Sequence, residues 1–294
     1  MPERGRFKFN VQRCFQEERS DGVRHLVSLE GWTRDSLGEL FDRVDHFDAK
    51  SGPRVEGAAA LFFPPSSLRT RVSFERGAFE MGLQPITFPP ETLDKSEDLA
   101  DVAGYLSAWV RLLVVRHPDI SVLQRLVDAD VLPVINAMTD VNHPCEVLSD
   151  LYALSQETDP FSLRFLFVGA DGNIARAWQE AAKAFGLSMI QSCPAELRVP
   201  GMPWQGDLMA AIADADVVIT DGPGPHAEAL TPYQVTGAVL DAATSGIRFA
   251  PCPPFIRGRE VSTDAIEHPA FVGYGFKQYL KPVQQAVMSW ALGE

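Results

Sequence analysis

The stretch LFFPPSSLRTRVSFERGAFEMG, residues 61–82, decides how this chain is organised. An apolar run that fits a buried strand ends at Pro64-Pro65, and Arg69-Thr70-Arg71 then open a segment that Gly82 ends. The pattern predicts a strand, a tight turn and a helix. The apolar residues that we expect along one face of this helix are Val72, Phe74, Ala78, Phe79 and Met81.

The start of this helix predicts an anion site. The N–H groups in the first turn of a helix have no partner within the helix and carry the positive end of its macrodipole. Hydroxyl and guanidinium groups beside them, here those of Ser66-Ser67 and Arg69-Thr70-Arg71, favour a phosphate or a carboxylate. In a plainer interpretation, Ser66 or Ser67 is only an N-cap and the arginines are ordinary surface residues. The stretch by itself fits both.

Composition sets the class of protein. A chain of 294 residues is long enough for two domains of about 130 to 150 residues, and 46% hydrophobic with 22% charged residues is typical of a globular protein. The formal charge of −13 argues against broad contact with nucleic acid or with an anionic membrane. The N-terminus lacks the apolar core of a signal peptide and no apolar run could span a bilayer, so we expect a cytoplasmic protein.

The cysteines and histidines give no metal signature. The four cysteines are scattered, with no Cys-x-x-Cys pair and no histidine spacing typical of zinc, and they fit reduced thiols: Cys14, Cys145, Cys193 and Cys252. We therefore expect no metal site.

Strands and helices alternate along the whole chain. The expected elements are a helix at 32–47 capped by Thr33, a strand at 58–63, the helix after SSLRTR, a helix at 97–110, a strand at 112–115, a helix at 120–130, a strand at 131–136, a helix after His143-Pro144, a strand at 164–168, a helix at 174–185, a strand at 217–220, apolar runs at 239–243 and 247–250, and a helix at 282–292. This pattern predicts an α/β fold with two doubly wound parallel-sheet domains, joined by interdomain helices. We place the first domain at 1–140 plus 278–294 and the second at 141–277.

Two further motifs lie where strands end or helices begin. Arg116-His117-Pro118 follows the buried run at 112–115, and a basic residue at the carboxyl end of such a strand faces the crevice where open α/β sheets bind ligands. His143-Pro144-Cys145-Glu146 opens the helix that follows the strand at 131–136, and proline is well tolerated at a helix start.

Five motifs in this order, SSLRTR, DKSED, RHP, HPCE and CPP, resemble those of the aspartate/ornithine carbamoyltransferase family. They span residues 61–254, and the leading and terminal helices also fit. The resemblance implies a homotrimer with active sites shared between subunits and no cofactor. It implies an enzyme that moves the carbamoyl group of carbamoyl phosphate to a small amine, with carbamoyl phosphate on the first domain and the amine on the second.

The resemblance also assigns roles to residues. Ser67, the Leu68 backbone, Arg69 and Thr70 would hold the phosphate, and Arg116 and His143 would join Thr70 around the carbonyl oxygen. The Cys252-Pro253 backbone would accept from the carbamoyl NH2 group, and Lys95 would reach into the neighbouring subunit's site. These residue types suit the chemistry, because an amine attacks a carbonyl, negative charge develops on its oxygen and phosphate departs.

The chain departs from the family at several positions. Glu146 stands where the family has glutamine; its carboxylate can accept from the carbamoyl NH2 group but cannot donate, and it brings negative charge near a dianion. The Arg-x-Gln element of aspartate enzymes is absent, and Asn173 and Asp221 resemble the ornithine branch. However, GPGPH replaces the Ser-Met-Gly of the ornithine branch. Cys252 lies in PCPP, which replaces the His-Cys-Leu-Pro of that branch, and Lys277 lies in YGFKQYL, which replaces its C-terminal Glu-Asn-Arg.

Two functions fit this pattern. One is a carbamoyltransferase whose acceptor is an ornithine-like amino acid or another small amine. The other is a non-catalytic relative that binds an anion and acts through assembly with a partner. A dinucleotide-binding protein is a poor third, because GADGN is not the G-x-G-x-x-G fingerprint. If Pro253-Pro254 matches the family's leucine-proline bond, we expect a cis peptide there.

Overall fold

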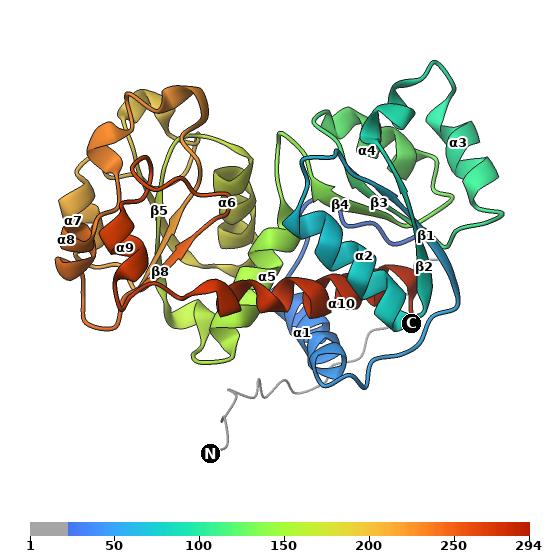
Figure 1. The fold of residues 1–294 in the computed structure, drawn as a ribbon, viewed down its shortest axis with the longest axis horizontal. Coiled ribbons are helices and arrows are strands. Elements are labelled where there is room, and N and C mark those ends of the chain that lie inside the picture. The colour runs from blue at the N-terminus through green and yellow to red at the C-terminus, as the bar shows by residue number, and fades with distance from the viewer. Residues whose placement is uncertain (1–22) are drawn as a thin grey trace. The chain divides into compact units, whose positions relative to one another are not determined.

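The computed structural model describes residues 23–294, and it forms two compact units (Figure 1). The first unit runs to Glu157 and takes in Gln278–Glu294, and the second unit is Thr158–Lys277. Cys14 and the polar N-terminal stretch, for which we expect no signal peptide, lie outside the described residues.

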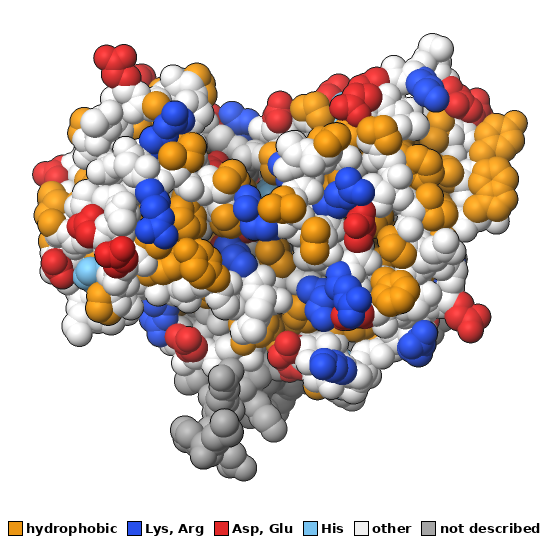
Figure 2. All heavy atoms as spheres, viewed as in Figure 1, with side chains coloured by type: hydrophobic (Ala, Val, Ile, Leu, Met, Phe, Trp, Pro, Cys, Tyr) orange, Lys and Arg blue, Asp and Glu red, His pale blue; other side chains and the backbone are white. Residues whose placement is uncertain are grey.

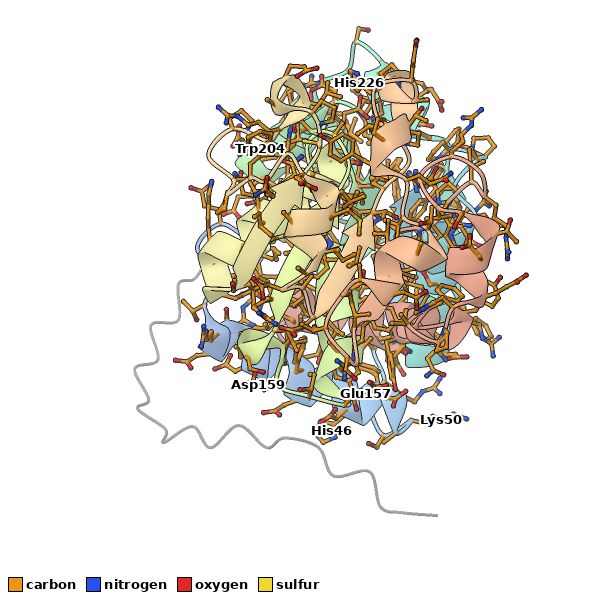
Figure 3. The ribbon with its side chains drawn as sticks, turned by 90° about the vertical axis from the view of Figure 1, so that its left-hand side faces the viewer. His46, Lys50, Glu157, Asp159, Trp204 and His226 are labelled. Atoms are coloured by element: carbon orange, nitrogen blue, oxygen red, sulfur yellow. The ribbon has the colours of Figure 1, made fainter. Side chains whose placement is uncertain are left out.

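The boundary between the units falls later than the expected division at residue 140. Helix α5 (Pro144–Ser155) belongs to the first unit, because all its residues are buried and it packs on strand β4 (Val134–Met138) and helix α10 (Leu280–Leu292). The boundary comes just after α5, at Glu157, which is labelled in Figure 3.

The first unit contains a parallel sheet of four strands in the order β2-β1-β3-β4. Because the strand order reverses between β1 and β3, the carboxyl ends of these two strands form the switch point where such sheets bind ligands. The remaining elements of this unit are α1 (Arg34–Asp48), β1 (Gly57–Phe62), α2 (Arg69–Met81), β2 (Leu83–Phe88), the short 3-10 helix η1 (Pro90–Asp94), α3 (Leu99–Leu106), β3 (Leu112–Arg116) and α4 (Ile120–Asp128).

Most of the elements expected in this unit are present, with shifted ends. Thr33 caps α1 as predicted, with its side chain accepting from the Ser36 N–H. The strand expected at 131–136 begins only at Val134, because Pro133 precedes it and cannot donate to a ladder. The helix expected to reach residue 110 ends at Leu106.

The predicted apolar face of α2 is partly wrong. Phe74, Ala78 and Met81 are buried, but Val72 and Phe79 are 56% and 64% exposed. The buried face is the one that packs against α10, where the Gln285 side chain donates to the Gly77 carbonyl at 3.1 Å. Val72 and Phe79 therefore lie on the solvent side of the helix.

The second unit repeats the design with a parallel sheet in the order β6-β5-β7-β8. Its switch point lies between β5 and β7. The main elements are β5 (Arg164–Val168), α6 (Asn173–Phe185), β6 (Ser188–Ser192), α7 (Leu208–Ile212), β7 (Val217–Thr220), α8 (Gly237–Asp241), β8 (Arg248–Pro251), α9 (Thr263–Glu267) and the 3-10 helix η6 (Tyr274–Tyr279).

The strands expected at 164–168 and 217–220 are confirmed. The apolar run at 239–243 falls instead in and after helix α8, which Thr236 caps through the Val239 N–H. Strand β6, at the edge of the sheet beside β5, was not among the elements expected from the sequence. No helix of residues 23–294 is both long and apolar enough to cross a membrane.

Candidate active site

The turn before α2 holds Ser67 in a fixed position. Its N–H donates to the Pro64 carbonyl at 2.9 Å, and its side chain is only 3% exposed. Helix α2 begins two residues later, at Arg69, with Leu68 at the N-cap, no side-chain cap and no acidic residue in the first turn. The interpretation of Ser66 or Ser67 as an N-cap is therefore wrong, because neither hydroxyl accepts from the first-turn N–H groups.

Arg116 meets this turn at the switch point of the first sheet. It is the last residue of β3, and its Nη1 atom donates to Ser67 Oγ at 3.1 Å. Strands β1 and β3 pair directly, with Phe62 opposite Val115, so the residues that follow them lie at one edge. The structure thus brings together Ser67 and Arg116, which the sequence placed at two separate strand ends.

Thr70 and Arg69 lie in the first turn of α2. Thr70 is 7% exposed, whereas Arg69 is exposed to solvent. A guanidinium group, a buried hydroxyl and open helix N–H groups at one strand edge form a positive site that suits an oxyanion.

His143 and Glu146 form a buried pair at the start of α5. His143 Nε2 lies 3.8 Å from Glu146 Oε2, and the two side chains are 5% and 6% exposed. This close approach gives the carboxylate a cationic neighbour whenever the imidazole is protonated. Cys145 between them is fully buried, and burial together with the negative charge of Glu146 raises the pKa of its thiol, so it is no nucleophile.

A buried polar network, which was not expected from the sequence, fixes the loop from β4 to His143. Thr139 Oγ1 accepts from the Asn142 N–H at 3.2 Å, and Asn136 Nδ2 donates to Asn142 Oδ1 at 2.6 Å. The side chains of Asn136 and Asn142 both donate to the Val27 carbonyl, at 2.8 and 3.1 Å. One sequence feature could have indicated this network: Asn136 lies in an otherwise apolar strand, and a fully buried amide needs hydrogen-bond partners.

Lys95 lies in an exposed loop that follows η1, beyond the carboxyl end of β2. Within residues 23–294 its ammonium group makes no hydrogen bond or ion pair with the other candidate residues of the first unit. The structure therefore puts Lys95 at the same edge of the sheet but not in contact with Ser67 or Arg116.

In the second unit, Asp221 and Asn173 both follow strand ends near the switch point between β5 and β7. Asp221 directly follows β7, and Asn173 is the first residue of α6. A Cβ atom on Gly172 would lie 3.9 Å from Asp221 Oδ2, so the carboxylate lies beside the start of α6. A carboxylate and a side-chain amide at this edge form a polar site suited to an amino group.

Cys252 and Pro253 follow β8 beside that edge. The Cys252 N–H donates to the Thr220 carbonyl at 2.9 Å, which ties the segment to the end of β7. The Pro253-Pro254 peptide is cis, as expected. Lys277 lies on η6, with its ammonium group 5.7 Å from the centre of the Phe276 ring.

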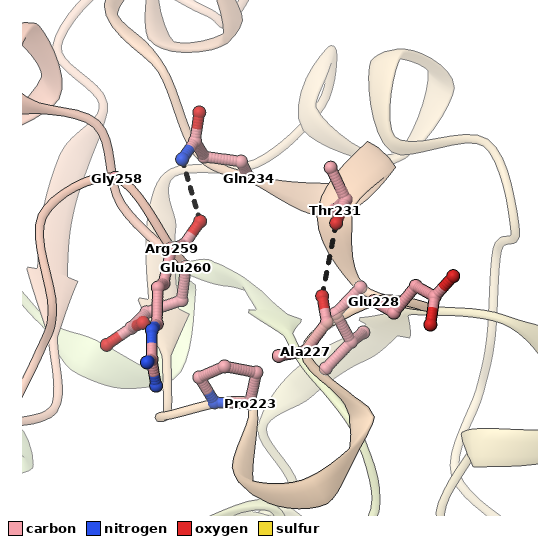
Figure 4. A pocket seen from close by; sticks show the side chains of 9 residues that line it. Pro223, Ala227, Glu228, Thr231, Gln234, Gly258, Arg259 and Glu260 are labelled. Atoms are coloured by element: carbon pink, nitrogen blue, oxygen red, sulfur yellow. Dashed lines mark hydrogen bonds between the residues drawn. The ribbon is translucent and has the colours of Figure 1, made fainter.

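A cavity of about 300 Å³ lies in the second unit between the segments 223–234 and 258–260 (Figure 4). None of the predicted acceptor residues lines it. Two of its side chains bond to backbone carbonyls of the lining: Gln234 Nε2 donates to the Arg259 carbonyl at 2.8 Å, and the Thr231 hydroxyl donates to the Ala227 carbonyl at 3.1 Å. In Figure 4 the Glu228 carboxylate points away from these groups. Among the described residues, no group of three His, Cys, Asp or Glu side chains could hold a metal ion.

Two parallel α/β units, one with a positive strand edge and one with a carboxylate and an amide at its edge, define a two-domain enzyme of the doubly wound class. The family model of the aspartate/ornithine carbamoyltransferase carbamoyl phosphate-binding domain matches residues 24–156, and that of the Asp/Orn-binding domain matches residues 162–291. The chain therefore belongs to the aspartate/ornithine carbamoyltransferase family, and it is a transferase.

Individual relatives agree with the family models. The chain is 31% identical to the ornithine carbamoyltransferase of Methanothermobacter thermautotrophicus, over 92% of this chain and 100% of the relative. It is 30% identical to that of Nitrobacter winogradskyi, over 93% and 99% of the two chains. Among solved structures, the ornithine carbamoyltransferase from Pyrococcus furiosus superposes with a TM-score of 0.85 at 25% identity, covering 92% of this chain and 98% of that one.

Proposed function

We propose that this carbamoyltransferase moves the carbamoyl group of carbamoyl phosphate to the amino group of an ornithine-like amino acid or another small amine, releasing phosphate. The binding of carbamoyl phosphate is supported by the 3.1 Å hydrogen bond from Arg116 to Ser67, which lies beside a helix start with no side-chain cap. The names of the relatives, all ornithine carbamoyltransferases, support the acceptor half.

The first unit would bind the donor. Ser67, the Leu68 backbone N–H, Arg69 and Thr70 would hold the phosphate, because they surround the start of α2. Lys95 would add a second cation, from the same copy or from a neighbour. The NH2 group of carbamoyl phosphate would donate hydrogen bonds to the Glu146 carboxylate and to the Cys252 and Pro253 carbonyls.

The reaction needs fixed positive groups and no covalent intermediate. The amine nitrogen forms a bond to the carbamoyl carbon, the bond from that carbon to the phosphate oxygen breaks, and the proton that the nitrogen loses is taken up by the departing phosphate. Negative charge passes through the carbonyl oxygen and ends on phosphate, so donors from Arg116, His143 and Thr70 would stabilise the transition state more than the ground state. Guanidinium suits the phosphate better than ammonium because it binds two oxygens at once.

The second unit would bind the acceptor. The Asp221 carboxylate, beside the start of α6, would accept from an α-ammonium group, and Asn173 would bond to the same end of the substrate. Lys277 would pair with a carboxylate of the acceptor. Aspartate fits poorly, because the chain has no Arg-x-Gln element for its second carboxylate.

One observation favours the second candidate, a non-catalytic relative that binds an anion. Glu146 puts a buried carboxylate 3.8 Å from His143, beside the position proposed for a dianion. Unless His143 is protonated, this negative charge opposes donor binding.

A panel of amines separates the two candidates. Incubation with carbamoyl phosphate and ornithine, its shorter and longer homologues, aspartate and simple alkyl amines should give phosphate and a ureido product with at least one amine other than aspartate. Tight binding of carbamoyl phosphate without turnover on the whole panel would favour the binding protein.

We also propose that the chain assembles as a homotrimer with shared sites. Leu68, Val72 and Phe79 form an apolar stripe on the solvent side of α2, with exposed fractions of 67%, 56% and 64%. In Figure 2 hydrophobic side chains gather over α3, and those over α2 lie among Lys and Arg side chains. If sites are shared, mixing the inactive variants Lys95→Ala and Arg116→Ala should restore activity, because hybrid trimers contain some intact sites.

A further inference from the structure

His117, directly after Arg116, is buried and bonded on three sides. Its side chain is 5% exposed. Nδ1 lies 3.1 Å from the Asp119 N–H and 3.2 Å from the Asp119 carbonyl, and Nε2 lies 2.9 Å from Asp94 Oδ1. Its own backbone N–H donates to the Met138 carbonyl at 3.1 Å, at the end of β4. The ring is therefore fixed in position.

Asp94 sits at the other end of this bond, at the start of the exposed loop that carries Lys95. Residues 94–98 are all exposed, between Leu93 and Leu99, which are 2% and 1% exposed. Lys95 has extended backbone angles, φ −68° and ψ 162°, which direct the chain away from η1. In the described chain, the bond from His117 to Asp94 is the single side-chain hydrogen bond between this loop and the strand ends.

A short covalent and hydrogen-bonded path thus joins two cations. Lys95 is adjacent in sequence to Asp94, Asp94 bonds to His117, and His117 is adjacent to Arg116, which bonds to Ser67. An exposed loop without such a tie would sample many conformations, and ordering it on ligand binding would cost free energy.

We propose that Asp94 and His117 are positioning residues. Their hydrogen bond holds the loop that carries Lys95 close to the end of β3, where Arg116 lies, so that binding of carbamoyl phosphate does not have to order this loop. The inference rests on the proposed donor site. It holds whether Lys95 serves its own copy or a neighbour, because in both cases the loop must be fixed in advance. Neither residue touches the donor; each acts through the cation next to it.

The alternative is a purely structural contact that stabilises the unit and has no effect on ligands. Three features argue against this. Asp94 is half exposed, with a side-chain exposure of 52%, so its net contribution to stability is small. The second feature is that its buried partner, His117, is adjacent in sequence to Arg116. The third is that the loop after Asp94 carries Lys95, the one lysine between residues 51 and 182.

The test uses the full chain and measures carbamoyl phosphate binding by calorimetry. Asp94→Ala should raise the Kd about tenfold and leave the thermal unfolding midpoint within about 1 °C of the wild type, because the substituted side chain is half exposed. Asp94→Asn should bind nearly as the wild type does, because its amide oxygen still accepts from Nε2. Glu97→Ala, in the same exposed loop, is the matched control and should leave the Kd unchanged.

A double substitution shows whether Asp94 acts through Lys95. Lys95→Ala alone should weaken binding, and in the Asp94→Ala protein the same change should have less than half that effect on a logarithmic scale. Full additivity, or an Asp94→Ala Kd within twofold of the wild type, overturns the positioning role. A wild type that does not bind carbamoyl phosphate at all overturns the donor site itself, and this inference with it.

Discussion

At the scale of single residues, Arg116 carries most of the chemistry assigned to the donor site. Its guanidinium already bonds to Ser67, so the group is in place before a ligand arrives. We expect Arg116→Ala to lower kcat/KM about 100- to 1,000-fold, the usual loss when one preorganised charge-stabilising donor is removed. Arg125→Ala, an exposed arginine on α4, is the control. Steady-state phosphate release measures both, and equal activities would remove Arg116 from the site.

Glu146 gives the second prediction at this scale. Glu146→Gln takes a negative charge out of a buried position and supplies an amide that both donates and accepts. We expect the KM for carbamoyl phosphate to fall about three- to tenfold, or about 0.7 to 1.4 kcal/mol. Asp140→Asn, an exposed carboxylate on the loop before His143, is the control. An unchanged or higher KM would mean that His143 already balances the charge, at the 3.8 Å separation seen here.

Some site residues could be predicted from the sequence and others could not, for a physical reason. Arg116 and Ser67 follow buried strands, so periodicity placed each of them near a strand end, and the family resemblance joined them in one site; the pairing of β1 with β3 brings those two ends to one edge. The bond between His117 and Asp94 joins two irregular loops, whose meeting depends on the conformations of both. Local sequence patterns do not encode that.

At the scale of elements, strands buried on both sides were the most predictable. The run at 164–168 became β5 with its predicted bounds, because a continuous apolar run fits a strand covered on two faces. The β6 strand, SMIQS, is short and half polar, and only pairing with β5 makes it a strand. On α2, both faces carry apolar residues, so helical spacing could not tell which face meets α10.

The strand starts of the second unit give a prediction about acid stability. Arg164, the first residue of β5, donates through Nε, Nη2 and its backbone N–H to Asp216, which precedes β7. These hydrogen bonds lower the pKa of the Asp216 carboxyl below its ordinary value. A pKa lower in the folded than in the unfolded state adds stability that is present above about pH 3.9 and is lost as the pH falls through the folded value.

We therefore expect Asp216→Asn to lower the unfolding midpoint by about 2 to 4 °C at pH 7, for about 0.5 to 1 kcal/mol after screening by solvent. The difference from the wild type should shrink below about pH 3.9. Asp214→Asn is the matched control, because Asp214 also pairs with Arg164 but is 87% exposed. A difference that stays the same from pH 7 to pH 3 would contradict the account. Thermal melts across this range provide the measurement.

At the scale of the whole molecule, the apolar stripe on α2 predicts association between copies. Exposed apolar side chains in a row favour burial against another surface, and a charge among them is costly to bury. Phe79→Asp should convert a trimer to a monomer at micromolar concentration, as measured by sedimentation. Met209→Asp, a 49% exposed residue of α7, should leave the trimer intact. A wild type that sediments as a monomer would contradict the proposal.

The central claim is that this molecule transfers a carbamoyl group to an amine other than aspartate. The most direct measurement supplies carbamoyl phosphate labelled at the carbonyl carbon together with ornithine, and follows the label by carbon NMR. The account predicts that the wild type moves the label into a ureido product with one phosphate released per transfer, that Arg116→Ala forms that product at least about 100 times more slowly, and that aspartate gives none. Label that stays in carbamoyl phosphate with ornithine and with every other amine of the panel, while the protein binds the donor, would contradict it.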